Sequence, residues 1–128
     1  MPNPKTSLYI ILGIIFWFVA AMIVRFGGSA IFSEGNPLLV VMFLITFPIT
    51  FVFLLVTMKV GKLKQAELLK PIVIITATAA ALDGIAMTWF RQLYSNSFEV
   101  SFYGSALILW GVSLGLIFSY IFSNPKIK

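Results

Sequence analysis

The sequence predicts an all-α integral membrane protein, a bundle of four transmembrane helices that forms a single domain over residues 1–128. Of its 128 residues, 60% are hydrophobic and 10% are charged, against roughly half and a quarter in soluble domains. Its mean hydropathy of +1.04 is too high for a water-soluble domain of this size, because the surface would remain mostly apolar. The charged residues also leave long uncharged runs between them, which is typical of membrane spans.

The gaps between charged residues give the position of each helix. A span needs about 20 apolar residues to cross roughly 30 Å of hydrocarbon. No charged residue lies within 6–24, 35–58 or 100–125. Within 71–90 the only charged residue is Asp83. We therefore predict helices at about 8–26, 38–58, 71–91 and 101–122.

Glycine, proline and serine mark the predicted connections. Gly-Gly at 27–28 and Gly-Asn-Pro at 35–37 break the chain between the first and second spans. Pro71 falls in the first turn of the third span, where proline is tolerated, and Ser-Asn-Ser at 95–97 precedes the fourth. The apolar run of the first span is longer than that of a signal peptide, so we expect this helix to remain uncleaved.

Basic residues predict the orientation in the membrane. Seven of the nine fall on one side if both termini do, and only Arg25 and Arg91 fall on the other. Because cytoplasmic segments carry the excess of Lys and Arg, we predict that both termini are cytoplasmic. The seven residues are Lys5, Lys59, Lys62, Lys64, Lys70, Lys126 and Lys128. This distribution accounts for the net charge of +5 without a nucleic-acid partner, and we expect none.

Four of these lysines crowd the connection between the second and third spans. They are Lys59, Lys62, Lys64 and Lys70. Near an anionic membrane surface each contributes about 1 kcal/mol of attraction. We therefore expect this loop to contact anionic lipid head groups, and docking of an acidic partner is the alternative.

Asp83 is the only aspartate in the chain and lies inside the third span. A carboxylate in this position costs about 2.5–3.5 kcal/mol. A helix rise of about 1.5 Å per residue places Asp83 within reach of Arg25 near the end of the first span, and we predict that Arg25 is its partner. Three roles stay open for Asp83: a structural lock between helices, a protonation or ligand site, and a carboxylate exposed to lipid.

Two tryptophans and a proline share the predicted depth of Asp83. Trp17 and Trp110 lie inside spans, although tryptophan favours the membrane interface, so they indicate an internal polar acceptor or a cavity. Ordinary packing is nevertheless the preferred interpretation for both, and an internal acceptor is the alternative. Pro48 predicts a kink in the second span, because it leaves the carbonyl of Leu44 without its helical partner. Asp83, Arg25, Trp17 and Trp110 thus form the candidate intramembrane polar site.

Small residues at four-residue spacing predict close contacts between helices. Such residues allow helix backbones to approach each other in lipid. The predicted packing positions are Gly111, Gly115 and Ser119 in the fourth span, and Ala80 and Gly84 in the third. We expect the third and fourth helices to pack within one bundle, and a homo-oligomer interface is the alternative.

A further set of residues recurs in the same order over most of the chain. These are Trp17, Arg25, Gly27, Phe32, Gly35, Asn36, Phe43, Pro48, Leu82, Asp83, Phe90, Asn96, Leu109 and Trp110. In this pattern the chain resembles a group of small four-span bacterial membrane proteins classed only as a domain of unknown function. It departs from them at Ser95, where a proline is common. The resemblance implies a protein of the bacterial cytoplasmic (inner) membrane and supplies no catalytic residues.

The residue types present narrow the function further. The chain has no Cys and no His, which removes thiolate and imidazole chemistry. We therefore expect no catalytic residues, no metal and no cofactor, and predict that the protein is not an enzyme. The first hypothesis is a non-enzymatic accessory or structural component of the lipid bilayer, bound within a larger membrane complex, whereas a small homo-oligomer would favour transport. The alternative is a small proton- or cation-linked transporter or channel that uses Asp83.

Overall fold

The computed structural model describes residues 4–123, which form four long helices and three short 3₁₀ helices. The long helices are α1 (Pro4–Gly27), α2 (Pro37–Gly61), α3 (Leu69–Trp89) and α4 (Phe98–Ser123). Each is long and apolar enough to cross a membrane. The all-α class and the four predicted spans are confirmed, with helix ends that differ from the predicted ones by about one turn at most.

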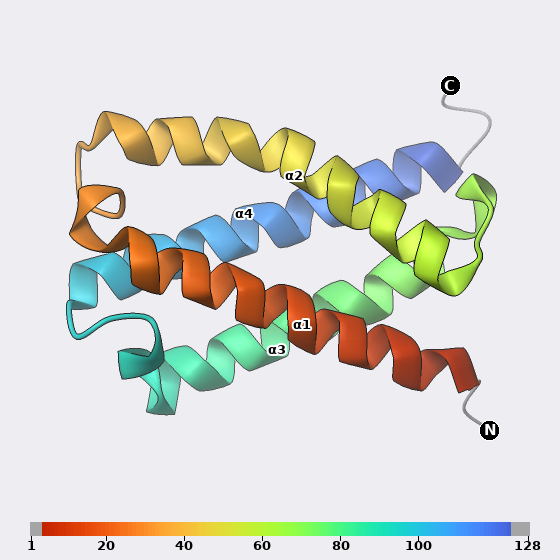
Figure 1. Ribbon diagram of the computed structural model, residues 1–128, viewed down its shortest axis with the longest axis horizontal. Coiled ribbons are helices and arrows are strands. Elements are labelled where there is room, and N and C mark those ends of the chain that lie inside the picture. Colours follow the sequence, from red (N-terminus) through yellow and green to blue (C-terminus); the bar gives the residue numbers. More distant parts are fainter. Residues whose placement is uncertain (1–3, 124–128) are drawn as a thin grey trace.

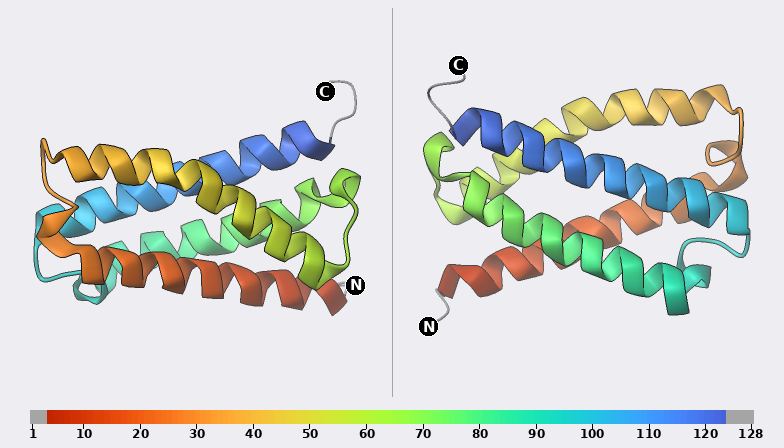
Figure 2. Two further views of the ribbon diagram at one scale, coloured as in Figure 1. Left: turned by 45° about the horizontal axis from the view of Figure 1, so that its top comes forward. Right: turned by 180° about the vertical axis from the view of Figure 1, so that it is seen from behind.

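The four helices form two layers, with α1 and α2 in front of α3 and α4 in Figure 1 and behind them in the reverse view of Figure 2. Helix α1 packs mainly against α3, α3 against α4, and α4 against α2, whereas α1 and α2 touch little. The start of α1, the α2–α3 connection and the end of α4 share one end of the bundle. We call this end, with the segment 59–70, the lysine end, and the opposite one the far end.

Local sequence explains the break between α1 and α2. Helix α2 begins at Pro37, a favoured first residue, and the side chain of Asn36 accepts a hydrogen bond of 2.9 Å from the Leu38 N–H. Gly35 before it has a φ of +74°, a conformation that a residue without Cβ adopts at little cost. The predicted connection at 27–37 is therefore explained by its glycines, asparagine and proline.

Two glycines allow α1 to approach its neighbours closely. A Cβ added at Gly13 would lie 2.7 Å from the Ile75 carbonyl oxygen on α3. A Cβ added at Gly104 of α4 would collide with the Val24 side chain of α1. Gly104 lies on nearly the same stripe as the predicted packing positions of α4, whereas Gly13 was not predicted to pack.

The predicted small residues of α4 face two different helices. A Cβ added at Gly115 would be 3.5 Å from Thr76 Cγ2 on α3, and one added at Gly111 would be 3.7 Å from Thr46 Cγ2 on α2. Ser119 is fully buried and donates a hydrogen bond of 3.0 Å to the Leu116 carbonyl of its own helix.

The predicted positions on α3 behave differently from those on α4. Ala80 is half-buried, but Gly84 is exposed and nothing lies within 4 Å of a Cβ added there. Contrary to expectation, Gly84 does not pack within the bundle. Successive helix residues point about 100° apart, so with Asp83 turned inward its neighbour Gly84 faces outward.

Candidate functional site

The carboxylate of Asp83 lies inside the bundle, in the half nearer the far end. The residue is 4% exposed, which excludes a carboxylate exposed to lipid. Six residues separate it from the end of α3 at Trp89, or about 9 Å along the helix. A buried carboxylate needs hydrogen-bond donors, and they come from two other elements.

Two hydroxyl groups donate hydrogen bonds to Asp83. The Tyr94 hydroxyl, from the α3–α4 connection, donates to Oδ1, and the Ser105 hydroxyl, from α4, donates to Oδ2. Ser105 lies seven residues after the start of α4 at Phe98, about 10 Å from that helix end and thus at the depth of Asp83. The carboxylate therefore links α3, α4 and their connection.

A short turn returns the connection to the interior of the bundle. Helix α3 ends at Trp89, and after Phe90 the 3₁₀ helix η3 (Arg91–Leu93) follows. The Tyr94 N–H then donates to the Arg91 carbonyl at 3.0 Å. Tyr94 is fully buried, so this residue of an external connection places its side chain among the spans.

Trp17 of α1 completes the cluster. Its indole N–H donates a hydrogen bond of 3.0 Å to the Tyr94 hydroxyl oxygen. We call the four residues Trp17, Tyr94, Asp83 and Ser105 the polar network. Because they come from α1, the α3–α4 connection, α3 and α4, the network joins most of the bundle at one depth.

Arg25 does not pair with Asp83, contrary to expectation. It is exposed, and its guanidinium donates to the carbonyls of Gln92 and Leu93 at 3.1 and 3.2 Å. Arg25 lies close to the end of α1, and its long side chain reaches the interface rather than the interior. It thereby holds the turn that precedes Tyr94, whose hydroxyl occupies the place beside Asp83 that was predicted for Arg25.

Trp110 makes a separate contact with α2. Its indole N–H donates a hydrogen bond of 3.0 Å to the Phe43 carbonyl. Helix α2 bends near its middle in Figure 1, and Pro48 lies in that part of the helix. A proline displaces the carbonyl four residues earlier, here Leu44, which is next to Phe43. The internal acceptor for Trp110 is thus a backbone carbonyl of α2, close to the proline.

Tyr94 and Ser105, the two residues that bind the carboxylate of Asp83, were not predicted from the sequence. The search for a partner favoured opposite charge and therefore chose Arg25. A nearby hydroxyl residue could have been considered as a partner, because any good hydrogen-bond donor satisfies a buried carboxylate. Tyr94 follows Asp83 by only eleven residues.

The hydroxyl groups of Tyr94 and Ser105 suit a structural role, in which they hold Asp83 in place. Burial, together with the hydrogen bond to Asp83, raises the pKa of the Tyr94 hydroxyl above its ordinary value. Tyr94 therefore stays a neutral donor throughout the physiological pH range. Both carboxylate oxygens of Asp83 are engaged by groups of the chain itself.

The raised pKa of Tyr94 predicts a loss of stability at high pH. Unfolded tyrosine ionises near pH 10, whereas folded Tyr94 keeps its proton, so its contribution is complete below about pH 10 and declines as the pH rises above it. Between about pH 9 and pH 11 the free energy of unfolding should fall more in the wild type than in Tyr94→Phe. Parallel declines in the two proteins, measured by chemical unfolding in bicelles, would contradict a buried neutral Tyr94.

Four membrane-length apolar helices packed around a buried carboxylate define a small multispan membrane protein. The model of a protein family described as "Family of unknown function (DUF5367)" matches residues 31–126. The chain belongs to this family, which confirms the predicted membership of a family without assigned function. The match covers Asp83, Tyr94 and Ser105. No curated protein and no solved structure matches the chain.

Proposed function

We propose that this protein is a non-enzymatic structural or accessory component of the bacterial cytoplasmic membrane. The main observation that supports this proposal is the polar network. Asp83, the only buried carboxylate of the described residues, accepts hydrogen bonds on both oxygens from Tyr94 and Ser105. A carboxylate bonded in this way fixes how α3, α4 and their connection pack.

The available side chains support a role without catalysis. The chain has no His and no Cys, and only four carboxylates. Within residues 4–123 no three His, Cys, Asp or Glu side chains come together in one group. Hydrolytic mechanisms generally need a positioned acid and base, and the hydroxyl groups around Asp83 are already committed to it.

The connections between helices bear on the choice of partner. They comprise residues 28–36, 62–68 and 90–97, so little of the described chain lies outside the four helices. A protein partner, or a second copy of the chain, would therefore meet mainly the outward faces of the helices in the bilayer. Association in lipid rests on packing and hydrogen bonds, which suits a component of a larger membrane complex.

The lysine end supports the proposed orientation. Its lysines at 59, 62, 64 and 70 are all exposed, and Lys5 donates a hydrogen bond of 2.8 Å to the Gly61 carbonyl at the same end. Lys126 and Lys128 lie outside the described residues. An excess of lysine favours the cytoplasmic side and contact with anionic lipid head groups, so we place both termini there.

The experiment that tests this function is purification from native membranes in mild detergent, followed by native mass measurement. We expect an assembly that contains other membrane proteins. Recovery only as a monomer or homo-oligomer would count against the proposal. Proton or cation flux in reconstituted vesicles that disappears in Asp83→Asn would overturn it in favour of the transporter alternative.

A further inference from the structure

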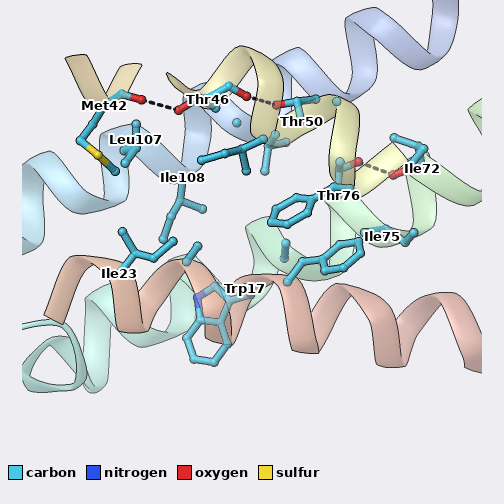
Figure 3. Close-up of a pocket in the computed structure, with 18 residues that line it drawn as sticks. Trp17, Ile23, Met42, Thr46, Thr50, Ile72, Ile75, Thr76, Leu107 and Ile108 are labelled. Atoms are coloured by element: carbon cyan, nitrogen blue, oxygen red, sulfur yellow. Dashed lines mark hydrogen bonds between the residues drawn. The ribbon is translucent and has the colours of Figure 1, made fainter. Parts of the chain in front are cut away.

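An apolar cavity of about 120 Å³ lies between the four helices, next to the polar network, whose Trp17 is one of its lining residues. All four helices contribute to its lining, and it is not fully enclosed. Figure 3 shows Trp17 and Ile23 of α1 on one side and Met42, Thr46 and Thr50 of α2 on the other. Asp83 is not among the lining residues.

The size of the cavity suits a small apolar group. An engineered cavity of about 150 Å³, lined by Leu, Ile and Phe, stays dry and binds benzene or xenon. On α1 the lining runs from Phe16 to Ile23, about 10 Å along the helix axis. The space is therefore elongated along the bundle and accommodates a segment of a hydrocarbon chain.

The lining side chains offer no free hydrogen-bond donor to a polar ligand. The hydroxyls of Thr46, Thr50 and Thr76 donate to carbonyls of their own helices at 2.8, 2.7 and 2.7 Å (Figure 3). The indole N–H of Trp17 is bonded to Tyr94. No charged side chain among the described residues lines the space. A water molecule there would find no free donor among the lining side chains, although it needs two to four partners, so the cavity favours hydrocarbon.

The side between α1 and α2 is where a chain from the bilayer has access. These two helices touch little, whereas the other neighbouring pairs around the bundle pack closely. The rings of Phe16 and Phe53 stack across this side with centroids 4.5 Å apart. This stack closes the part of the α1–α2 side that is nearer the lysine end. Ile23 and Met42 line the part of the cavity that is nearer the far end.

We propose that the cavity binds an acyl chain of a membrane lipid, inserted between α1 and α2 beyond the Phe16–Phe53 stack. The helices span a bilayer, so acyl chains are the hydrocarbon that surrounds this opening. An inserted chain gives the lining residues the van der Waals contacts that an empty space denies them. The ligand is thus a lipid tail held by shape, and Trp17 is the one residue of the polar network that lines its site.

The test uses phosphatidylcholine vesicles whose lipid carries a photoreactive diazirine near the end of one acyl chain. After illumination, peptide mass spectrometry identifies the labelled residues. Ile108 of α4 lines the cavity and is 7% exposed, whereas its neighbour Leu109 is 56% exposed. We expect label on both residues in the wild type. Label on Leu109 with none on Ile108 would overturn the proposal.

Two cavity-filling variants and one matched control complete the test. Ala79→Leu and Ala20→Leu each place a larger side chain in the cavity, while Ala81→Leu makes the same change on the exposed side of α3. We expect loss of Ile108 labelling in both filled variants and full labelling in the control, with Leu109 labelled throughout as the measure of insertion. If a filled variant inserts into the vesicles and its Ile108 is labelled as in the wild type, the proposal is also overturned. If neither filled variant inserts, the labelling of Ile108 in the wild type alone tests the proposal.

Discussion

Replacement of Asp83 by leucine is expected to lower the free energy of unfolding by about 2–4 kcal/mol. The change removes the acceptor shared by the hydroxyls of Tyr94 and Ser105, and a buried polar group left without a partner costs about 1–3 kcal/mol. The measurement is chemical unfolding in bicelles, followed by circular dichroism.

Asp83→Asn is the matched control for this substitution. It keeps the shape of the side chain and an acceptor oxygen for Tyr94, so we expect a loss of about 1 kcal/mol at most. If Asp83→Leu unfolds with the same free energy as the wild type, the carboxylate does not hold α3, α4 and their connection together.

Gly13→Ala is expected to destabilise the protein by about 1–3 kcal/mol, the usual cost of overpacking. The new Cβ would lie 2.7 Å from the Ile75 carbonyl oxygen and 2.7 Å from Thr78 Cβ. Because the first of these atoms belongs to the backbone of α3, a rotamer change cannot relieve the clash, and α1 must move away. The free energy of unfolding in bicelles gives the cost directly.

The chain provides its own control in Gly84, which lies within a helix but has no atom within 4 Å of an added Cβ. Gly84→Ala should be neutral or stabilise by about 0.5–1 kcal/mol, since alanine favours the helical backbone over glycine. Equal effects of the two substitutions would mean that α1 and α3 are not in close contact at Gly13.

The fold was predictable because one physical constraint dominates the sequence. A helix in lipid must be apolar over its whole length, so charged residues mark the connections and leave the spans between them. Asp83 did not obscure the third span, because a single carboxylate in an otherwise apolar stretch indicates an internal position. The ends of the helices followed from proline and glycine at 27–28 and 35–37.

The candidate site was predictable only in part. The inward position of Asp83 followed from the cost of burying polar groups, whereas internal acceptors for Trp17 and Trp110 were only the alternative to ordinary packing. Tyr94 was missed because its role depends on the path of η3 (Arg91–Leu93), which returns a connection to the bundle and leaves no periodic signal.

The spacing of small residues did not distinguish the glycines that pack against another helix from those that do not. The four-residue spacing selected Gly84, but spacing alone does not say whether a face turns toward another helix or toward lipid. Gly13 has no small residue four positions away in α1, so the spacing could not select it. Its role depends on where α3 crosses α1, which is a property of the assembled bundle.

The central claim is that a hydrogen bond from Tyr94 to Asp83 holds the far end of the bundle together. A double-mutant cycle with Tyr94→Phe and Asp83→Leu, measured as free energies of unfolding in bicelles, tests it most directly. In the wild type Tyr94→Phe removes both the donor to Asp83 and the acceptor of the Trp17 N–H, so it should cost about 2 kcal/mol. In Asp83→Leu the same change removes only the acceptor of Trp17, so it should cost about 1 kcal/mol or less. We therefore expect a coupling energy of about 1 kcal/mol or more between Tyr94 and Asp83. A double variant whose loss of unfolding free energy equals the sum of the two single losses to within about 0.3 kcal/mol would contradict the hydrogen bond.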